Sequence, residues 1–320
     1  MGTEDQQKEP HMNKYLRIHP SISYAVKHNF PVVALESTVI THGLPYPENE
    51  QLALAVEEEI RALGAVPATI ALLDGYIHIG LDQEQIHVLA FPDPSVEKRK
   101  VSRKDFGATL VKGIVGGTTV AATMAVANMV NIKVFATGGI GGVHRGHPTD
   151  ISADLPELSH TPVLVVCAGA KAILNLPDTL EFLETWGVPV IGFQTDELPA
   201  FYSRESRLPV DHNAKTPQEI ARIASVHWAL GLKSGILVGN PPPADMALPA
   251  DVVEGWITTA LQEAEEQEIS RAAVTPFLLA RVSELSGGNS MQTNIALLRN
   301  NARLAANIAK ALAAANLPLI

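Results

Sequence analysis

The chain has 320 residues, 46% of them hydrophobic, so it is long enough to bury a large core in one or two domains. Its formal net charge of −10 argues against a non-specific nucleic-acid or anionic-membrane surface, because both need basic patches. A single cysteine, a polar N-terminal segment without an apolar core, and no apolar run of about 18 residues predict a cytoplasmic protein without disulfides or membrane helices.

The predicted elements alternate between strands and helices along most of the chain, after a disordered tail at residues 1–15. Asp74-Gly75 lies between two apolar runs and predicts a β-hairpin over 67–80. Lys100 to Arg103 are predicted to lie in a polar connection. The strands are expected at 31–38, 67–73, 76–80, 133–136, 163–167, 188–193 and 235–239, and the helices at 21–30, 47–63, 82–90, 120–130, 178–186, 217–230, 250–267, 275–286 and 291–314.

This alternation predicts one three-layer α/β/α domain over residues 16–320. The early hairpin needs an antiparallel pair, so we expect the central sheet to be mixed and mostly parallel. Ligands of such proteins bind outside the carboxyl ends of the strands. Functional groups are therefore expected directly after the strands.

The stretch from 132 to 175 holds two strand-like runs, each followed by small residues and then by polar groups. Glycines after the first run allow the backbone to approach a ligand closely. They do not complete a dinucleotide motif, because His144 stands where G-x-G-x-x-G needs its third glycine. A loop holding a phosphate is the better interpretation.

Gly116 to Thr119 precede an apolar helix and offer a second anion site, because free backbone N–H groups and the helix dipole favour negative charge there. The alternative is an ordinary helix N-cap.

Lys171 follows the second strand across three small residues. An amine among apolar neighbours is poorly hydrated, which disfavours its charged form and leaves it free to attack a carbonyl-type carbon. The alternative is a lysine at a helix start that reaches solvent.

Asp150 and Asp154 are four residues apart around Ser152 and would share a face of a helical turn. Two carboxylates and a hydroxyl are suited to Mg²⁺ or Mn²⁺, with His144 as a further ligand or hydrogen-bond donor. The alternative is a helix N-terminus enriched in aspartate.

Glu36 ends a strand that is otherwise apolar, where an unpaired carboxylate is costly. It is therefore a candidate general acid or base. The alternative is a structural salt bridge, for example to Lys100.

Ten segments between about residues 18 and 310 resemble one known family, the pseudouridine-5′-phosphate glycosidases, also known through the indigoidine-cluster A proteins. The segments are VVALESTVITHGLPYPEN, VPATIALLDG, KVSRKDF, GTTVAATM, VFATGGIGGVHRG, DISADLPEL, VVCAGAKAIL, LETWGVPVIGF, LPAFYS and TPFLLARVSELSGGNSMQTNIALLRNNA. Matches of this length in this order are highly specific.

The resemblance implies a homotrimeric C–C glycosidase that reversibly converts pseudouridine 5′-phosphate to uracil and ribose 5-phosphate, with one Mn²⁺, Mg²⁺ or other divalent ion per subunit. By motif, Lys171 is the nucleophile, which forms a Schiff base, Glu36 is the proton donor and Asp150 is the metal ligand. Fewer residues separate Arg145 from Asp150 than in many relatives. This difference bears on the exact position of the metal-binding loop and not on the identity of the ligand. The expected substrate-binding residues are Lys100, Val120, Thr137, His144, Ser152, Ala153, Asp154 and Asn294.

Two other functions use the same residues. A Schiff-base aldolase would need the lysine but would release no base. A non-catalytic sugar-phosphate sensor would not need Glu36, Lys100, Asp150 and Lys171 together, and all four are present.

Overall fold

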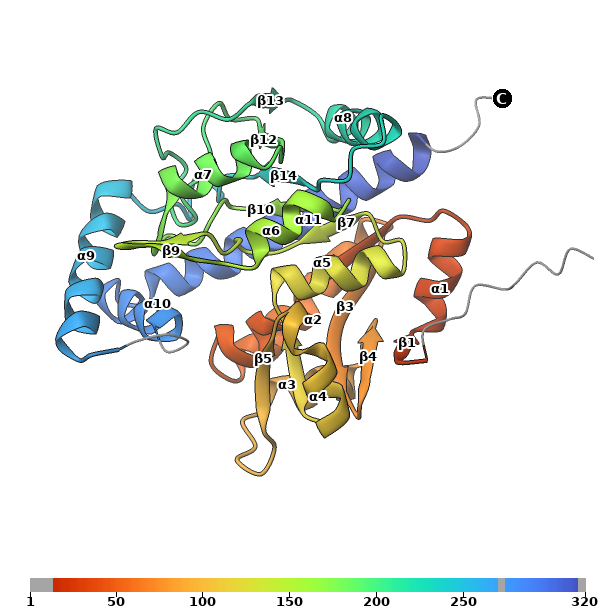
Figure 1. Ribbon diagram of the computed structural model, residues 1–320, viewed down its shortest axis with the longest axis horizontal. Coiled ribbons are helices and arrows are strands. Elements are labelled where there is room, and N and C mark those ends of the chain that lie inside the picture. The colour runs from red at the N-terminus through yellow and green to blue at the C-terminus, as the bar shows by residue number, and fades with distance from the viewer. Residues whose placement is uncertain (1–13, 270–273, 316–320) are drawn as a thin grey trace, which may run out of the picture.

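A computed structural model describes residues 14–269 and 274–315 of the chain. Its main feature is an 11-stranded mixed sheet in which nine strands follow the order β1-β4-β3-β2-β7-β10-β14-β12-β13, while β6 pairs with β3 and β5 pairs with β6 (Figure 1). These strands are β1 (Leu16–Ile18), β2 (Val32–Leu35), β3 (Val66–Leu73), β4 (Tyr76–Ile79), β5 (Lys98–Val101), β6 (Val115–Thr118), β7 (Val134–Ala136), β10 (Leu164–Cys167), β12 (Val190–Phe193), β13 (His212–Ala214) and β14 (Ile236–Gly239).

The centre of the sheet is parallel and buried. β2, β7, β10 and β14 are neighbours in parallel register, and the runs VVAL of β2 and LVVC of β10 are buried throughout. Continuous apolar runs are typical of parallel strands that are covered on both faces. The predicted mixed, mostly parallel sheet is therefore confirmed.

The antiparallel part of the sheet surrounds β3, which pairs antiparallel with both β4 and β6. The turn between β3 and β4 has Asp74 at φ 52° and Gly75 at φ 77°. Positive φ at both central residues is the requirement of a two-residue hairpin turn, which Asp-Gly meets at little cost. The predicted hairpin is confirmed.

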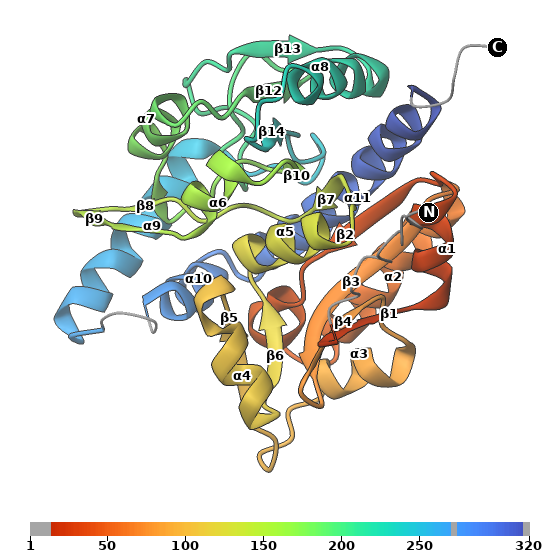
Figure 2. The same ribbon diagram turned by 45° about the vertical axis from the view of Figure 1, so that its right-hand side comes forward.

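Helices cover both faces of the sheet. In Figure 1, α5 and α6 lie in front of β7 and β10, and α11 crosses behind them; Figure 2 shows the same layers from another direction. The α-helices are α1 (Pro20–Lys27), α2 (Glu48–Ala62), α3 (Gln83–Ala90), α4 (Phe106–Lys112), α5 (Val120–Met129), α6 (Asp154–His160), α7 (Leu176–Thr185), α8 (Pro217–Ala229), α9 (Ala250–Glu266), α10 (Val274–Leu285) and α11 (Asn289–Ala315).

One expectation about local structure is wrong: the polar segment around Lys100 is not a connection but strand β5. It pairs in parallel with β6, which contains Gly116 and Gly117 of the segment predicted to precede an apolar helix. A Cβ atom on Gly117 would lie 2.2 Å from the Thr41 hydroxyl oxygen. This strand position therefore needs glycine, because another segment packs directly against its backbone.

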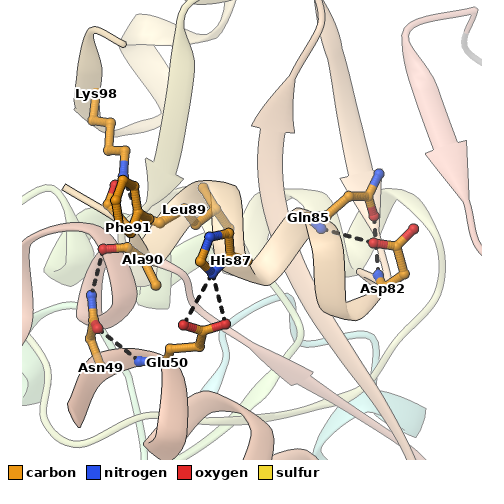
Figure 3. Close-up of polar contacts among 9 residues, drawn as sticks. All are labelled: Asn49, Glu50, Asp82, Gln85, His87, Leu89, Ala90, Phe91 and Lys98. Atoms are coloured by element: carbon orange, nitrogen blue, oxygen red, sulfur yellow. Dashed lines mark hydrogen bonds and ion pairs between the residues drawn. The ribbon is translucent and has the colours of Figure 1, made fainter. Parts of the chain in front are cut away.

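Two polar side chains, Asn49 and Lys98, bind backbone carbonyls at the end of α3. Figure 3 shows both side chains. The Asn49 amide donates to the carbonyl of Ala90 at 3.1 Å and to that of Ile40, in the short π-helical turn η1 (Val39–Gly43), at 2.7 Å. The Lys98 amine donates to the carbonyls of Phe91 and Leu89 at the end of α3. Lysine at a helix C-terminus is favourable because it meets unpaired carbonyls and the negative end of the dipole. These contacts hold β5 and η1 beside the cavities described below.

No helix within the described ranges has the length and apolarity to cross a bilayer. Most of the tail predicted at 1–15, and the last five residues of the domain predicted at 16–320, lie outside the described residues.

Candidate active site

The segments that follow β7 and β10 lie side by side and are joined by backbone hydrogen bonds. Ala168 N donates to Gly138 O at 2.8 Å, and Lys171 N donates to Ile140 O at 3.0 Å. Gly169 has φ 86°, and a Cβ there would lie 2.0 Å from the Pro199 carbonyl oxygen. The small residues before the lysine therefore let two loops and a third backbone segment meet at the carboxyl ends of adjacent parallel strands.

Two cavities meet at this edge of the sheet, and four residues line both of them: Glu36, Thr38, Lys100 and Lys171. The apolar lobe has a volume of about 240 Å³ and is further lined by Val39, His42, Gly43, Gly138, Gly139, Phe201, Leu279, Asn294 and Leu298. The polar lobe has a volume of about 310 Å³ and is further lined by Ser102, Lys104, Thr119, Val120, Gly141, His144, Ile151, Ser152, Ala153, Asp154, Ile173 and Leu174.

Glu36 lies at the junction of the lobes, directly after β2, and is half-buried. Its Oε1 accepts a short hydrogen bond from the hydroxyl of Thr137. Burial raises the pKa of Glu36, and the positive charge of Lys171 and the Thr137 hydrogen bond oppose that rise only in part. No cation of the described residues forms an ion pair with Glu36, so the structural salt bridge considered above is not formed. A carboxyl group whose pKa is raised holds its proton longer than an exposed one, which makes Glu36 a candidate general acid or base.

Two basic side chains that line the cavities have lowered pKa values. Burial, and then repulsion from Lys171, lower the pKa of Lys100, which lines both cavities. Burial, and then the charges of Lys100 and Lys98, lower the pKa of His42. Both cationic forms are therefore disfavoured at the junction.

The predicted anion site at the start of α5 is already occupied by the chain itself. Asp154 is buried, with 5% of its surface exposed, and its two oxygens accept from Ala121 N at 2.9 Å and from Gly141 N at 2.7 Å. The Thr119 hydroxyl caps Ala122 N at 3.3 Å. The helix start is therefore an N-cap with an internal carboxylate, which ties the glycine-rich loop to α5.

Asp150 and Asp154 do not share a face of one helix, contrary to the prediction. Asp150 lies on β9 (His147–Ile151), which pairs with β8 (Val143–His144) and, through it, with β11 (Leu174–Asn175), and α6 begins only at Asp154. Side chains alternate along a strand, so Asp150 points away from Ile151, which borders the polar lobe. Asp150 is exposed, lines neither lobe, and has no hydrogen-bond or ion-pair partner among the residues described.

The other predicted substrate-binding residues divide between three positions. Val120, His144, Ser152 and Ala153 line the polar lobe, and Asn294 lines the apolar lobe. Thr137 is buried behind Glu36, with 1% exposed, and lines neither lobe, because its hydroxyl is turned to the carboxylate.

Several lining residues were not predicted from the sequence. Ser102 and Lys104 belong to the KVSRK segment that also carries Lys100, and this proximity was the available signal. Phe201, Leu279 and Leu298 come from three distant segments and carry no local signal, since an apolar side chain reads simply as core.

The donor set for a metal ion is small. No group of three or more His, Cys, Asp or Glu side chains within the described ranges is placed to hold a metal. Both oxygens of Asp154 bind backbone amides, which leaves the free carboxylate of Asp150, two residues before Ser152 of the polar lobe. One hard oxygen ligand fits a largely hydrated Mg²⁺ or Mn²⁺, which takes only one or two carboxylates from a protein.

The fold and the cavity pair define an α/β enzyme with a lysine and a carboxyl group at the junction of an apolar and a polar lobe. The chain matches the family model described as indigoidine synthase A-like protein over residues 21–311, and it belongs to that family.

Similar proteins are named as enzymes of one kind. The chain is 54% identical to pseudouridine-5′-phosphate glycosidase of Dinoroseobacter shibae, over 94% of this chain and 99% of that one. It is 52% identical to the protein of the same name from Escherichia coli, over 92% and 95%. The solved structure of the prealnumycin C-glycosynthase AlnA in complex with ribulose 5-phosphate superposes with a TM-score of 0.87 at 37% identity, covering 95% of this chain and 99% of that one.

Proposed function

We propose that the protein cleaves the carbon–carbon glycosidic bond of pseudouridine 5′-phosphate reversibly, giving uracil and ribose 5-phosphate. The observation that carries this proposal is the position of Glu36 and Lys171 on the wall shared by the two lobes. The apolar lobe suits a flat base, and the polar lobe, with Lys104, Ser102 and Ser152, suits a sugar phosphate. The names of the relatives point to the same substrate.

Lys171 acts as the nucleophile in this proposal. Its neutral amine attacks C1′, the C1′–O4′ bond breaks, O4′ takes a proton from Glu36, and the new ammonium nitrogen returns a proton to Glu36, which restores the nitrogen lone pair. The nitrogen lone pair then forms a C=N bond to C1′ while the bond from C1′ to C5 of uracil breaks and C5 takes a proton. Water hydrolyses the resulting Schiff base to ribose 5-phosphate and the free amine, so covalent catalysis divides one hard step into easier ones.

Glu36 moves the protons that these steps require. It borders both lobes, so it can reach the sugar oxygen on one side and the base carbon on the other. Burial raises its pKa, so the protonated form is more readily available than in an exposed carboxyl group.

Asp150 is the proposed ligand of a divalent ion, Mn²⁺ or Mg²⁺, and a bound ion would supply positive charge on the exposed face of β9, next to the segment that carries Ser152. Activity should fall after exhaustive chelation and return with Mn²⁺, and Asp150→Ala should lose this response.

We further propose that the subunits form a trimer. A mass of one chain, 34.2 kDa, in light scattering would contradict this proposal.

The direct test is incubation with pseudouridine 5′-phosphate and Mn²⁺ while free uracil is measured. Uridine 5′-phosphate, which carries the same base on a C–N bond, is the matched control and should release far less. Wild-type protein that releases no uracil would contradict the proposal, and cleavage of a sugar phosphate alone would favour an aldolase.

A further inference from the structure

A buried pair of amide side chains lies behind the glycine-rich loop and is not part of either cavity. Asn301 of α11 has 0% of its surface exposed, and Asn240, directly after β14, has 4%. Asn240 Nδ2 donates to Asn301 Oδ1 at 3.0 Å, and Asn240 N donates to Cys167 O at 2.8 Å. The pair therefore connects α11 to the ends of β10 and β14.

The other end of the Asn301 amide holds the loop that carries Thr137. Asn301 Nδ2 donates to Thr137 O at 2.8 Å and lies 3.4 Å from Gly138 O. Thr137 N donates in turn to Val166 O at 3.0 Å. The backbone of Thr137 is thus fixed on both sides, and its hydroxyl is directed at the Glu36 carboxylate.

We infer that Asn301 is a positioning residue for Glu36, acting through Thr137. A short hydrogen bond to a carboxylate stabilises the charged form, but only while the donor is held in place. Neither Asn301 nor Asn240 touches the cavities, so their effect on the reaction passes through the orientation of the Thr137 hydroxyl. Asn301 therefore sets how readily Glu36 gives up its proton.

A merely structural role for Asn301 is the alternative, and it makes a different prediction. In that case its loss would lower the melting temperature without changing the pH at which Glu36 titrates. Asn300, the preceding residue of α11, offers a matched control: its Nδ2 donates to Pro241 O at 3.1 Å and makes no contact with the Thr137 loop.

The first measurement is the pH profile of kcat/KM for uracil release, so this test depends on the proposed function. Thr137→Val removes the hydrogen bond to Glu36 and should move one limb of the profile upward by about one pH unit, the size expected for a hydrogen bond to a charged group. Thr137→Ser keeps the hydroxyl and should leave that limb close to its wild-type position. An unmoved profile in Thr137→Val would overturn the inference.

The second measurement is a double-mutant cycle. Asn301→Ala should move the same limb in the same direction by a smaller amount, and Asn300→Ala should not move it. The combined Thr137→Val and Asn301→Ala variant should shift no further than Thr137→Val alone, because both changes remove one interaction. Additive shifts, or a shift in Asn300→Ala as large as in Asn301→Ala, would contradict a path through Thr137.

A third measurement tests the inference by NMR titration and does not require the protein to be catalytically active. The Glu36 carboxyl carbon can be followed by ¹³C NMR in protein labelled at glutamate, with its resonance assigned by its absence in Glu36→Gln. Its midpoint should rise in Thr137→Val and in Asn301→Ala, or in Asn240→Ser should Asn301→Ala not fold. An unchanged midpoint overturns the inference even if uracil is released, whereas a wild-type protein that releases no uracil overturns only the proposed function.

Discussion

The two lobes of the cavity share four wall residues but are built in opposite ways. The apolar lobe is lined by side chains from three distant segments, Phe201, Leu279 and Leu298, for which no side-chain hydrogen bond is possible. The polar lobe is formed by loops held together by hydrogen bonds, above all those of Asp154 to two backbone amides. One lobe therefore depends on tertiary packing and the other on a local polar network.

This difference assigns distinct tasks to the lobes. A packed apolar wall tolerates changes of shape at a moderate cost in affinity, whereas a network of buried hydrogen bonds fails when one member is lost. The proposed reacting groups, Glu36 and Lys171, line both lobes, so the proposal places one part of the substrate among apolar side chains and the other among polar groups.

The largest expected effect comes from removing the proposed nucleophile, Lys171, which lines both lobes. Lys171→Ala should lower uracil release on the order of 10⁴-fold or more, as for other nucleophile deletions, without loss of the fold. Lys171→Arg should be equally inactive, because a guanidinium stays charged and forms no imine. Borohydride reduction with ribose 5-phosphate should attach the sugar to Lys171, as peptide mass analysis would show. An adduct on Lys100 would refute the assignment.

The next largest effect should follow from breaking the network of the polar lobe. Asp154→Asn leaves only one side-chain oxygen for the amides of Ala121 and Gly141. Displacement of the glycine-rich loop by about 1 Å should cost roughly 10²-fold in kcat/KM. Asp251→Asn, an exposed change in the first turn of α9, is the control for general disturbance and should leave kcat/KM and the melting temperature nearly unchanged. Equal losses of thermal stability in both variants would count against a network centred on Asp154.

A smaller effect separates the two lobes by ligand. Leu298→Ala should raise the KM for uracil in the condensation reaction by roughly 10-fold, in line with lost apolar contacts, and leave the Kd of ribose 5-phosphate nearly unchanged. Lys104→Ala should do the reverse, weakening ribose 5-phosphate by about 10-fold through loss of a charged contact. Isothermal titration and steady-state kinetics would measure both. If each variant weakened both ligands alike, the division of the substrate between the lobes would be wrong.

The smallest expected effect concerns the free energy of unfolding, which ionisation of Glu36 lowers as the pH rises. Its pKa is raised by folding, so the folded state binds the proton more tightly, and stability is lost as pH rises from the unfolded pKa, near 4.5, through the folded pKa. Glu36→Gln removes this loss and should therefore be more stable than wild type at pH 8 and similar at pH 4. The expected gain is about 1.4 kcal/mol for each tenfold increase in the proton affinity of Glu36 on folding. Thermal unfolding at the two pH values would show it, and a less stable variant at pH 8 would contradict the cause.

Much of the fold could be predicted from the sequence because its signals are local. The apolar runs of β2 and β10 and the Asp74-Gly75 turn identify the parallel centre and the hairpin. β5 could not be predicted in this way, because its sequence KRKV is charged and becomes a strand only through pairing with β6. Local propensity is a weak guide where a partner strand decides.

The site divides along the same line. The positions of Glu36 and Lys171 after strands were visible in the sequence, since such residues gather at one edge of a parallel sheet. The hydrogen bonds from the backbone amides of Ala121 and Gly141 to Asp154 could not be predicted, because residues 121 and 141 come together only in the folded chain. Asn301 was equally hidden, as a polar residue in a long helix indicates an exposed face unless its surroundings are known.

Helix α11 joins the apolar lobe to the support of Glu36. It supplies Asn294 and Leu298 to the apolar lobe and Asn301 to the contact with Thr137, and its Arg299 and Arg303 form ion pairs with Glu59 of α2. A helix moves largely as one rigid rod, so a shift of α11 against α2 would change the apolar wall and the Thr137 contact at the same time. A substitution at Glu59, outside both lobes, is therefore expected to act on the two features together.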